Sequence, residues 1–174
     1  MNRRADKNDV EGFLKALSNK ERYVRIAAVE ALRELGDPKA VPGLINALND
    51  PDAGVRWVAA GALGALGEAA AVPALLAVLD DGDTVLRDVA VQSLARIGRP
   101  SLGGLLELLD HDNSDMRLAA VQALGEMAQP DTTSNLVDAL QDKDWQIRWA
   151  ALKALENIGT PEALALARKW KSIE

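Results

Sequence analysis

Apolar residues recur along the chain at a spacing that places them on one face of an α-helix. Five arginines each follow an apolar residue, which we number repeat position 0, and positions 0, 4, 8 and 11 are apolar in every copy. At 3.6 residues per turn these positions form one stripe. The residues at position 0 are Val24, Val55, Leu86, Met116 and Ile147. The pattern therefore predicts five amphipathic helices of the same design.

A shorter apolar segment precedes each of these helices. "AVPGLINALND" (40–50) matches "AVPALLAVLDD" (71–81), and weaker copies follow at 101–111 and 133–142. A proline near the start of a helix is tolerated, because the first N–H groups have no partner within the helix. Residues suited to N-caps stand three positions before position 0; they are Asp52, Asp83, Asn113 and Asp144. The segments predict a shorter helix before each long one.

The arginines are spaced by 31, 31, 30 and 31 residues, which identifies an internal repeat. Short turns rich in Asp, Pro and Gly join the two helices of each copy, so we expect antiparallel pairs. The predicted fold class is all-α, an α-solenoid of stacked helix pairs with about eleven helices. We expect a single domain over residues 1–174, with pairs at about 9–36, 37–67, 68–98, 99–128 and 129–159 and a closing helix at 160–171.

The consensus of the second helix is "VR..A..AL..LG", and that of the first is "AVP.L...L.D". These motifs resemble the short HEAT-like repeat, a type also named after phycobilisome lyase subunits. The ankyrin and tetratricopeptide signatures are absent from the sequence. The resemblance implies that the second helices line a concave side, and that this side receives a partner.

Repeat position 2 lies roughly 200° from position 0 on the helix, away from the stripe that stacking buries. It holds tryptophan in two copies, and tryptophan and tyrosine are enriched in interaction hot spots. The predicted protein-binding residues are Tyr23, Ile26, Trp57, Asp88, Gln92, Leu118, Gln122, Trp145, Trp149 and Lys153. The alternative is that Trp57 or Trp149 packs on an adjacent repeat. We expect Trp170 to cover the end of the core.

The five repeated arginines suggest phosphate binding or a structural ladder. We favour the ladder, because an arginine next to the buried stripe can reach the turns of the next repeat, such as those at Asp50, Asp81 and Asp142. Such contacts would hold adjacent repeats in register.

Composition removes several classes of function. The chain has no cysteine and one histidine, which excludes a conventional zinc site and a Cys-His nucleophile. We expect His111 to have a turn role, and we predict no catalytic residue, no metal ligand and no cofactor. The net charge of −6 argues against nucleic acid and anionic membranes. The first ten residues lack the apolar stretch of a secretion signal, so we expect a cytoplasmic protein.

The favoured hypothesis is a non-enzymatic protein-binding scaffold that takes a protein or peptide partner and is a monomer or a weak homodimer. Two alternatives stay open. A bilin lyase or lyase-like subunit follows from the resemblance alone. A nucleic-acid-binding HEAT-like protein is the other, although the exposed positions of the five second helices sum to a charge of −3.

Overall fold

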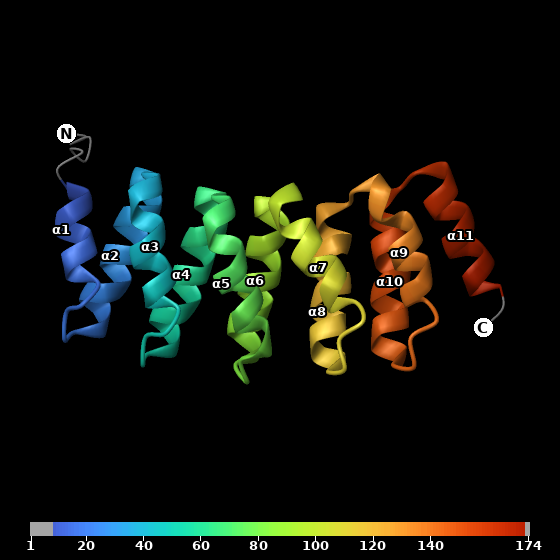
Figure 1. Cartoon of the computed structure of the whole chain (residues 1–174), viewed down its shortest axis with the longest axis horizontal. Helices are drawn as coiled ribbons and strands as arrows, with labels where there is room; N and C mark the ends of the chain where they lie inside the picture. The colour runs from blue at the N-terminus through green and yellow to red at the C-terminus, as the bar shows by residue number, and fades with distance from the viewer. Residues whose placement is uncertain (1–8, 173–174) are drawn as a thin grey trace. The chain divides into compact units, whose positions relative to one another are not determined.

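The computed structural model describes residues 9–172, which form α-helices joined by short turns and contain no β-strand (Figure 1). The helices are α1 (Asp9–Ala16), α2 (Arg22–Leu35), α3 (Val41–Ala47), α4 (Ala53–Leu66), α5 (Val72–Ala77), α6 (Thr84–Ile97), α7 (Leu102–Leu108), α8 (Ser114–Met127), α9 (Thr133–Ala139), α10 (Trp145–Ile158) and α11 (Pro161–Lys171). Single 3-10 turns lie at Pro38–Ala40, Ala69–Ala71, Val78–Asp80, Arg99–Ser101 and Pro130–Thr132. All five predicted long helices are present, and each has 14 residues.

The chain divides into two compact units at Gly98. Unit 1 contains the helix pairs α1/α2, α3/α4 and α5/α6, with the second helices α2, α4 and α6 packed side by side. Unit 2 contains the pairs α7/α8 and α9/α10, with α8 packed on α10 and α11 on α10. The single domain that we expected from the repeat stays a prediction.

Four of the long helices begin directly after the predicted N-cap residues. Asp52 accepts a hydrogen bond from the backbone N–H of Val55, and Asp144 accepts one from that of Gln146. Asp83 and Asn113 do the same for their helices. Left-handed glycines end α2, α4 and α10. Ala128 takes this conformation at the end of α8, with φ 48°, although it has a Cβ.

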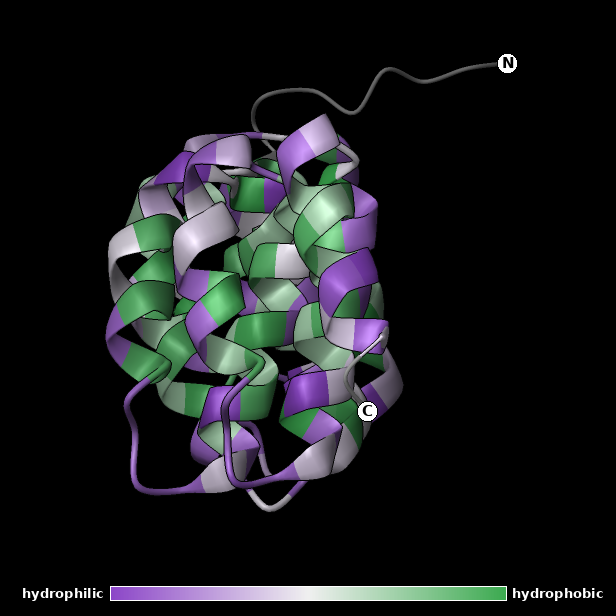
Figure 2. Ribbon diagram, turned by 90° about the vertical axis from the view of Figure 1, so that its right-hand side faces the viewer, coloured by the Kyte–Doolittle hydropathy of each residue, from purple (hydrophilic) through white to green (hydrophobic). Residues whose placement is uncertain are grey.

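The core of each unit lies between the helix pairs. Val55, Ala59 and Leu63 of α4 are fully buried, as the stripe predicts. The view in Figure 2 shows hydrophobic residues along the helices and hydrophilic residues in the turns that join them. The stripe fails at one place, because Val24 is 40% exposed. Val24 belongs to the first described repeat, whose second helix packs on α1 and α4 and meets no earlier second helix among residues 9–172.

Two glycines bring neighbouring second helices unusually close together. A Cβ built on Gly64 would lie 2.6 Å from the Cα of Ser93. A Cβ on Gly125 would lie 3.1 Å from the Cα of Ala154. Gly64 and Gly125 occupy the same repeat position, so α4/α6 in unit 1 and α8/α10 in unit 2 use the same device for close packing.

Candidate protein-binding surface

The ten predicted binding residues fall into two sets of five, one on the second helices of each unit. In unit 1, Tyr23, Asp88 and Gln92 are exposed, and Ile26 and Trp57 are half-buried. In unit 2, Gln122, Trp145, Trp149 and Lys153 are exposed, and Leu118 is half-buried. The binding role of these residues stays a prediction, but their surroundings separate them clearly.

Trp57 is engaged by the next repeat. Its indole Nε1 donates a hydrogen bond of 2.7 Å to Oδ2 of Asp83, the N-cap residue of α6, and Arg56 donates a second to the same oxygen at 3.1 Å. The indole N–H of Trp57 lowers the pKa of Asp83 against the opposing effect of burial, and backbone N–H groups and Arg56 add to that lowering. The packing alternative therefore describes the contacts of Trp57.

Trp145 and Trp149 of α10 have no such partner. They are 65% and 51% exposed, and their indole nitrogens donate to no residue that the structure describes. Lys153 continues the row one turn further on, with its Nζ 4.8 Å from the ring centroid of Trp149, which is a cation–π contact. We call Trp145, Trp149 and Lys153 the α10 stripe. It is an exposed aromatic surface at a spacing of four residues, on one face of one helix.

Glu156 fixes the far end of the α10 stripe. Its carboxylate accepts hydrogen bonds from Nζ of Lys171 in α11 at 2.6 Å and from Nζ of Lys153 at 2.9 Å. These bonds, the one from Lys171 first, lower the pKa of Glu156. Glu156 therefore positions the ammonium group of Lys153, which lies over the ring of Trp149.

Tyr23 in unit 1 is 68% exposed but also has a partner on its own helix. Nη2 of Arg22 donates a 2.6 Å hydrogen bond to the tyrosine hydroxyl, and its guanidinium carbon lies 4.6 Å from the ring centroid. Arg22 in turn contacts Asp52 at 3.3 Å. Tyr23 is thus an accessible ring whose hydroxyl already accepts a hydrogen bond.

The arginine ladder is confirmed at two rungs. Arg25 binds Asp50 through two hydrogen bonds of 2.7 Å, and Arg117 binds Asp142 at 2.7 and 3.1 Å. Arg117 lowers the pKa of Asp142, although burial acts in the opposite direction. At these two rungs the guanidinium groups face carboxylates, as the ladder alternative predicts and phosphate binding does not.

The predicted turn at Asp81 is also reached, through a different carboxylate of that turn. Arg56 contacts Asp83 and not the side chain of Asp81, because the carboxylate of Asp83 is held toward α4 by the indole of Trp57. Arg87 donates to the backbone carbonyls of Leu79 and Asp81 in its own repeat. The turn before α6 therefore presents its N-cap carboxylate to the preceding helix, and its carbonyls to the following one.

The remaining chemistry is sparse among residues 9–172. His111 is exposed, and its Nδ1 accepts a hydrogen bond from the backbone N–H of Asn113 at 3.1 Å, which confirms its turn role. Within this range, no cluster of three or more His, Cys, Asp or Glu residues is arranged to hold a metal ion. None of the described helices combines the length and the apolar character that crossing a membrane requires.

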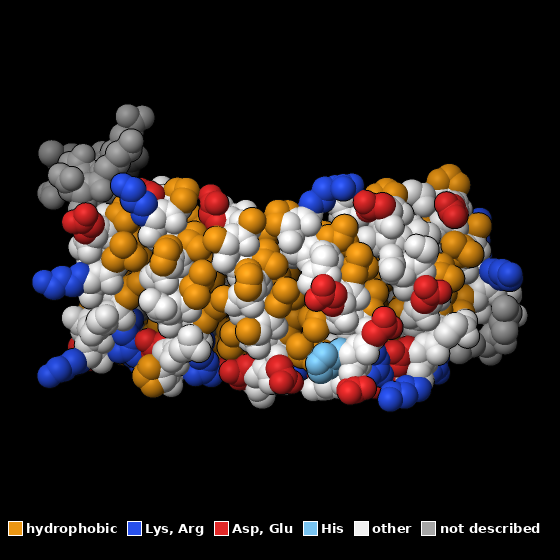
Figure 3. Space-filling model, viewed as in Figure 1, with side chains coloured by type: hydrophobic (Ala, Val, Ile, Leu, Met, Phe, Trp, Pro, Cys, Tyr) orange, Lys and Arg blue, Asp and Glu red, His pale blue; other side chains and the backbone are white. Residues whose placement is uncertain are grey.

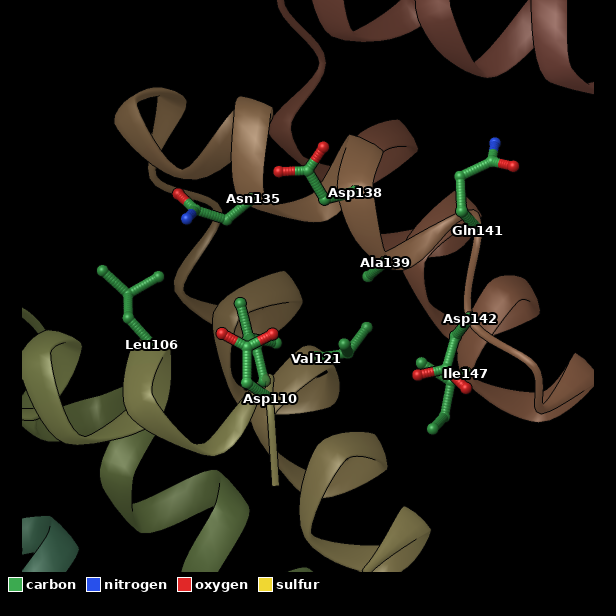
Figure 4. A pocket seen from close by; sticks show the side chains of 10 residues that line it. Leu106, Asp110, Val121, Asn135, Asp138, Ala139, Gln141, Asp142 and Ile147 are labelled. Carbon is green, nitrogen blue, oxygen red and sulfur yellow. The ribbon is translucent and has the colours of Figure 1, made fainter. Parts of the chain in front are cut away.

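Sequence reasoning missed a cleft in unit 2 between α7 and α9, because it treated the first helices only as packing elements. The cleft has a volume of about 230 Å³. Its lining residues are Leu106, Leu109, Asp110, Val121, Asn135, Asp138, Ala139, Gln141, Asp142 and Ile147 (Figure 4). A signal was present: the first-helix segments 101–111 and 133–142 are the copies that depart most from the "AVP" pattern.

Comparison with known proteins yields one family. The pattern described as HEAT repeats matches residues 10–95 and 102–170. No curated protein matches the chain. The family match agrees with the resemblance seen in the second-helix motif.

Three solved structures illustrate the likeness. The archaeal HEAT-like repeat protein of Thermococcus onnurineus NA1 aligns with a TM-score of 0.62 and 18% identity, over 96% of this chain and 87% of that one. The complex of CpcE and CpcF of phycocyanin lyase from Nostoc sp. PCC7120 gives 0.55 and 24%, over 97% and 84%. A designed armadillo repeat protein in complex with the peptide (KR)4 gives 0.53 and 19%, over 95% and 89%. At these identities the likeness concerns the fold, and it confirms the predicted all-α solenoid class.

Proposed function

Because the chain belongs to the family of HEAT repeats, we propose that it is a non-enzymatic scaffold module that binds a protein or peptide segment on its second helices. The observation that carries this proposal is the α10 stripe, where Trp145 and Trp149 are exposed one turn apart. These two large rings stand largely in water on a well-capped helix, and their indole nitrogens donate to no residue that the structure describes. They are suited to contact with a partner chain.

The chemistry around the α10 stripe indicates the kind of contact. The rings offer apolar area and two free indole N–H donors, and Lys153 beside them offers a cation that Glu156 holds in place. Aromatic anchors next to polar groups are typical of the centres of protein interfaces. A repeat-protein neighbour was solved in complex with a peptide, which supports a peptide-binding use of this fold class.

The proposal extends to what the chain does not do. With no cysteine and with its single histidine bound to the backbone of a turn, it offers no Cys–His nucleophile pair, which favours a non-enzymatic role. The net charge of −6 favours a protein partner over nucleic acid. We propose a cytoplasmic location and a monomeric or weakly dimeric state, and light scattering at several concentrations tests the latter.

The test compares two double variants. Trp145→Ser/Trp149→Ser removes both rings, and Glu162→Ser/Lys169→Ser changes two exposed α11 residues without altering net charge. Each chain is immobilised and exposed to an extract of the cells that produce it, and the captured proteins are quantified by mass spectrometry. We expect the first variant to lose its partner more than about tenfold, because each hot-spot truncation costs roughly 2 kcal/mol or more. The second variant should capture the partner as the wild type does.

Circular dichroism makes the outcome interpretable. If the Trp145→Ser/Trp149→Ser variant keeps its helicity and still captures the same proteins, the α10 stripe is not the binding surface. If that variant unfolds, the rings are structural and the proposal fails. A third variant, Trp57→Phe, is expected to retain capture, because Trp57 already uses its indole N–H within unit 1.

A further inference from the structure

The α7–α9 cleft of unit 2 combines an apolar floor with an acidic rim. Val121 and Ile147, from the buried sides of α8 and α10, form its floor together with Ala139 of α9. Asp110 follows α7, and Asp138 belongs to α9, so the two carboxylates approach the cleft from different helix pairs (Figure 4). The cleft is therefore lined by groups of two distinct chemical kinds.

The acidic charge of the rim is not neutralised within the unit. The third carboxylate of the cleft, Asp142, is paired with Arg117. Asp110 and Asp138 are exposed, and neither takes part in a hydrogen bond or ion pair of its side chain with any residue that the structure describes. No lysine or arginine lines the cleft. Asp110 also lines a neighbouring pocket with Arg117 and Lys143, but neither Asp110 nor Asp138 forms an ion pair with a residue that the structure describes. Two negative charges thus stand unpaired beside an apolar surface.

The corresponding place in unit 1 shows that the repeat does not need these carboxylates. Counting from the buried leucine of each first helix, Asp110 corresponds to Asn49, and Asp138 corresponds to Ala77. Figure 3 shows the contrast, with acidic side chains over α7 and α9 and mainly hydrophobic or uncharged ones over α3 and α5 between their ends. Helix packing therefore leaves the carboxylates of unit 2 unexplained.

We propose that the α7–α9 cleft binds a lysine or arginine side chain of a partner polypeptide. The alkyl stem would lie along Ala139 and Leu106, and the cationic head would meet Asp110 and Asp138. A volume of about 230 Å³ is below the range of about 300–1,000 Å³ that is usual for small-molecule sites, so it fits a single side chain better than a cofactor. This site goes beyond the proposed function, because its carboxylates lie on and after first helices and it uses no residue of the α10 stripe.

The probe is an end-capped octapeptide of alternating lysine and arginine. It is titrated into the isotopically labelled full chain while the methyl signals of Leu106, Val121 and Ile147 are followed by NMR. Saturable shifts at these methyls are the expected result. Shifts confined to methyl groups outside the cleft, or no methyl shifts in the cleft, overturn the proposal.

Two double variants of equal charge separate a site from a general acidic surface. Asp110→Asn/Asp138→Ala installs the residues of unit 1, which this repeat tolerates. Glu30→Gln/Glu34→Gln removes two exposed carboxylates from the second helix α2. We expect the cleft variant to weaken binding about five- to tenfold, as the loss of two partly exposed ion pairs implies, and the other variant less than about twofold. Equal losses would mean that net charge alone attracts the peptide, and would overturn the proposal.

A third comparison tests the stem. An octapeptide of 2,3-diaminopropionate has the same number of side-chain amines as an all-lysine octapeptide but almost no alkyl chain. It should bind more weakly than that octapeptide and leave the cleft methyls unshifted; equal binding would contradict the role of the apolar floor. The Trp145→Ser/Trp149→Ser variant should bind the lysine–arginine octapeptide normally, so failure of this inference and failure of the proposed function are distinguishable.

Discussion

Trp57 of unit 1 and Trp149 of unit 2 occupy the same repeat position, directly after the repeated arginine, yet their surroundings differ. The indole of Trp57 is bound to Asp83 of the following helix pair. Trp149 is followed by the single helix α11, and its ring is contacted by Lys153 of its own helix. Nearly identical local sequences therefore give one ring that joins repeats and one that is available to a partner. The neighbouring repeat decides which.

The arginines beside these two rings also differ in their contacts with the next repeat. Arg56 and Arg148 each donate a hydrogen bond to a backbone carbonyl of their own turn, at Asp50 and Asp142, and Arg56 also reaches the carboxylate of Asp83 in the next pair. In a repeat array, the contacts of a side chain depend on the next module as much as on its own sequence. Substituting one residue in one unit, and comparing the change in stability with that at a matched position, tests this dependence.

The largest expected effect is at the buried rung of unit 2. Asp142→Asn removes the charge that neutralises Arg117, and the two side chains are only 12% and 7% exposed. We expect the free energy of unfolding to fall by about 3 kcal/mol, because a guanidinium group is left buried without a counter-ion. Urea denaturation measures the change.

The control is the exposed pair Arg99–Asp131, whose side chains are 72% and 48% exposed. Asp131→Asn should change stability by less than about 0.5 kcal/mol. If both substitutions have the same small effect, the Arg117–Asp142 rung does not hold unit 2 together.

Close packing of second helices should be equally sensitive in both units. Gly64→Ala and Gly125→Ala each place a Cβ against the adjacent helix, and each should cost about 1–3 kcal/mol. Gly103→Ala in α7 is the control, since a Cβ there meets nothing within 4 Å, and alanine favours helix. A cost in only one unit would show that the two pairs do not use the same device.

The Arg117–Asp142 rung also predicts a dependence on pH. The pKa of Asp142 is lowered in the folded state, so the stabilisation is complete above the usual pKa of an aspartate and is lost as the pH falls through the lowered value. Asp142→Asn lacks this stabilisation at every pH, so its difference from the wild type should be largest near neutral pH. Stability curves of wild type and Asp142→Asn should converge as the pH is lowered; parallel curves would contradict this.

The two tryptophans should respond differently to the same substitution. Trp57→Phe removes the indole donor to Asp83 and should destabilise the protein measurably in thermal unfolding. Trp149→Phe removes no hydrogen bond to a described residue and should stay within about 0.5 kcal/mol of the wild type. Equal losses of stability would show that the ring of Trp57 joins the repeats no more than the ring of Trp149 does.

The smallest effect is a gain. Ala128 ends α8 in a left-handed conformation that glycine adopts at the ends of α2, α4 and α10. Ala128→Gly should raise the free energy of unfolding by about 0.5–1 kcal/mol, because it relieves backbone strain but loosens the unfolded chain. No gain in chemical denaturation would mean that the cap of unit 2 is already relaxed.

The sequence was sufficient for the helices, their caps and two rungs of the ladder, because periodicity and cap chemistry are local. It was insufficient to predict the exposure of Val24, the hydrogen bond of Trp57 to Asp83 and the α7–α9 cleft. Exposure of Val24 depends on which helices lie next to the first repeat, and the bond of Trp57 depends on how Asp83 is aimed. The cleft requires residues 110 and 138, which are far apart along the chain, to be placed at one opening. These features follow from neighbours in space, which a repeat pattern leaves unspecified.

The N-cap aspartate of α6 has a consequence for engineering. The carboxylate of Asp83 both caps the N-terminus of α6 and accepts a hydrogen bond from the indole of Trp57 in the preceding helix pair. Grafting a further helix pair with such an aspartate behind α10 would therefore convert Trp149 from an exposed ring into one that is hydrogen-bonded to the next repeat. The number of helix pairs in such an array, and not the sequence of each pair, would then set how many of these tryptophans stay exposed.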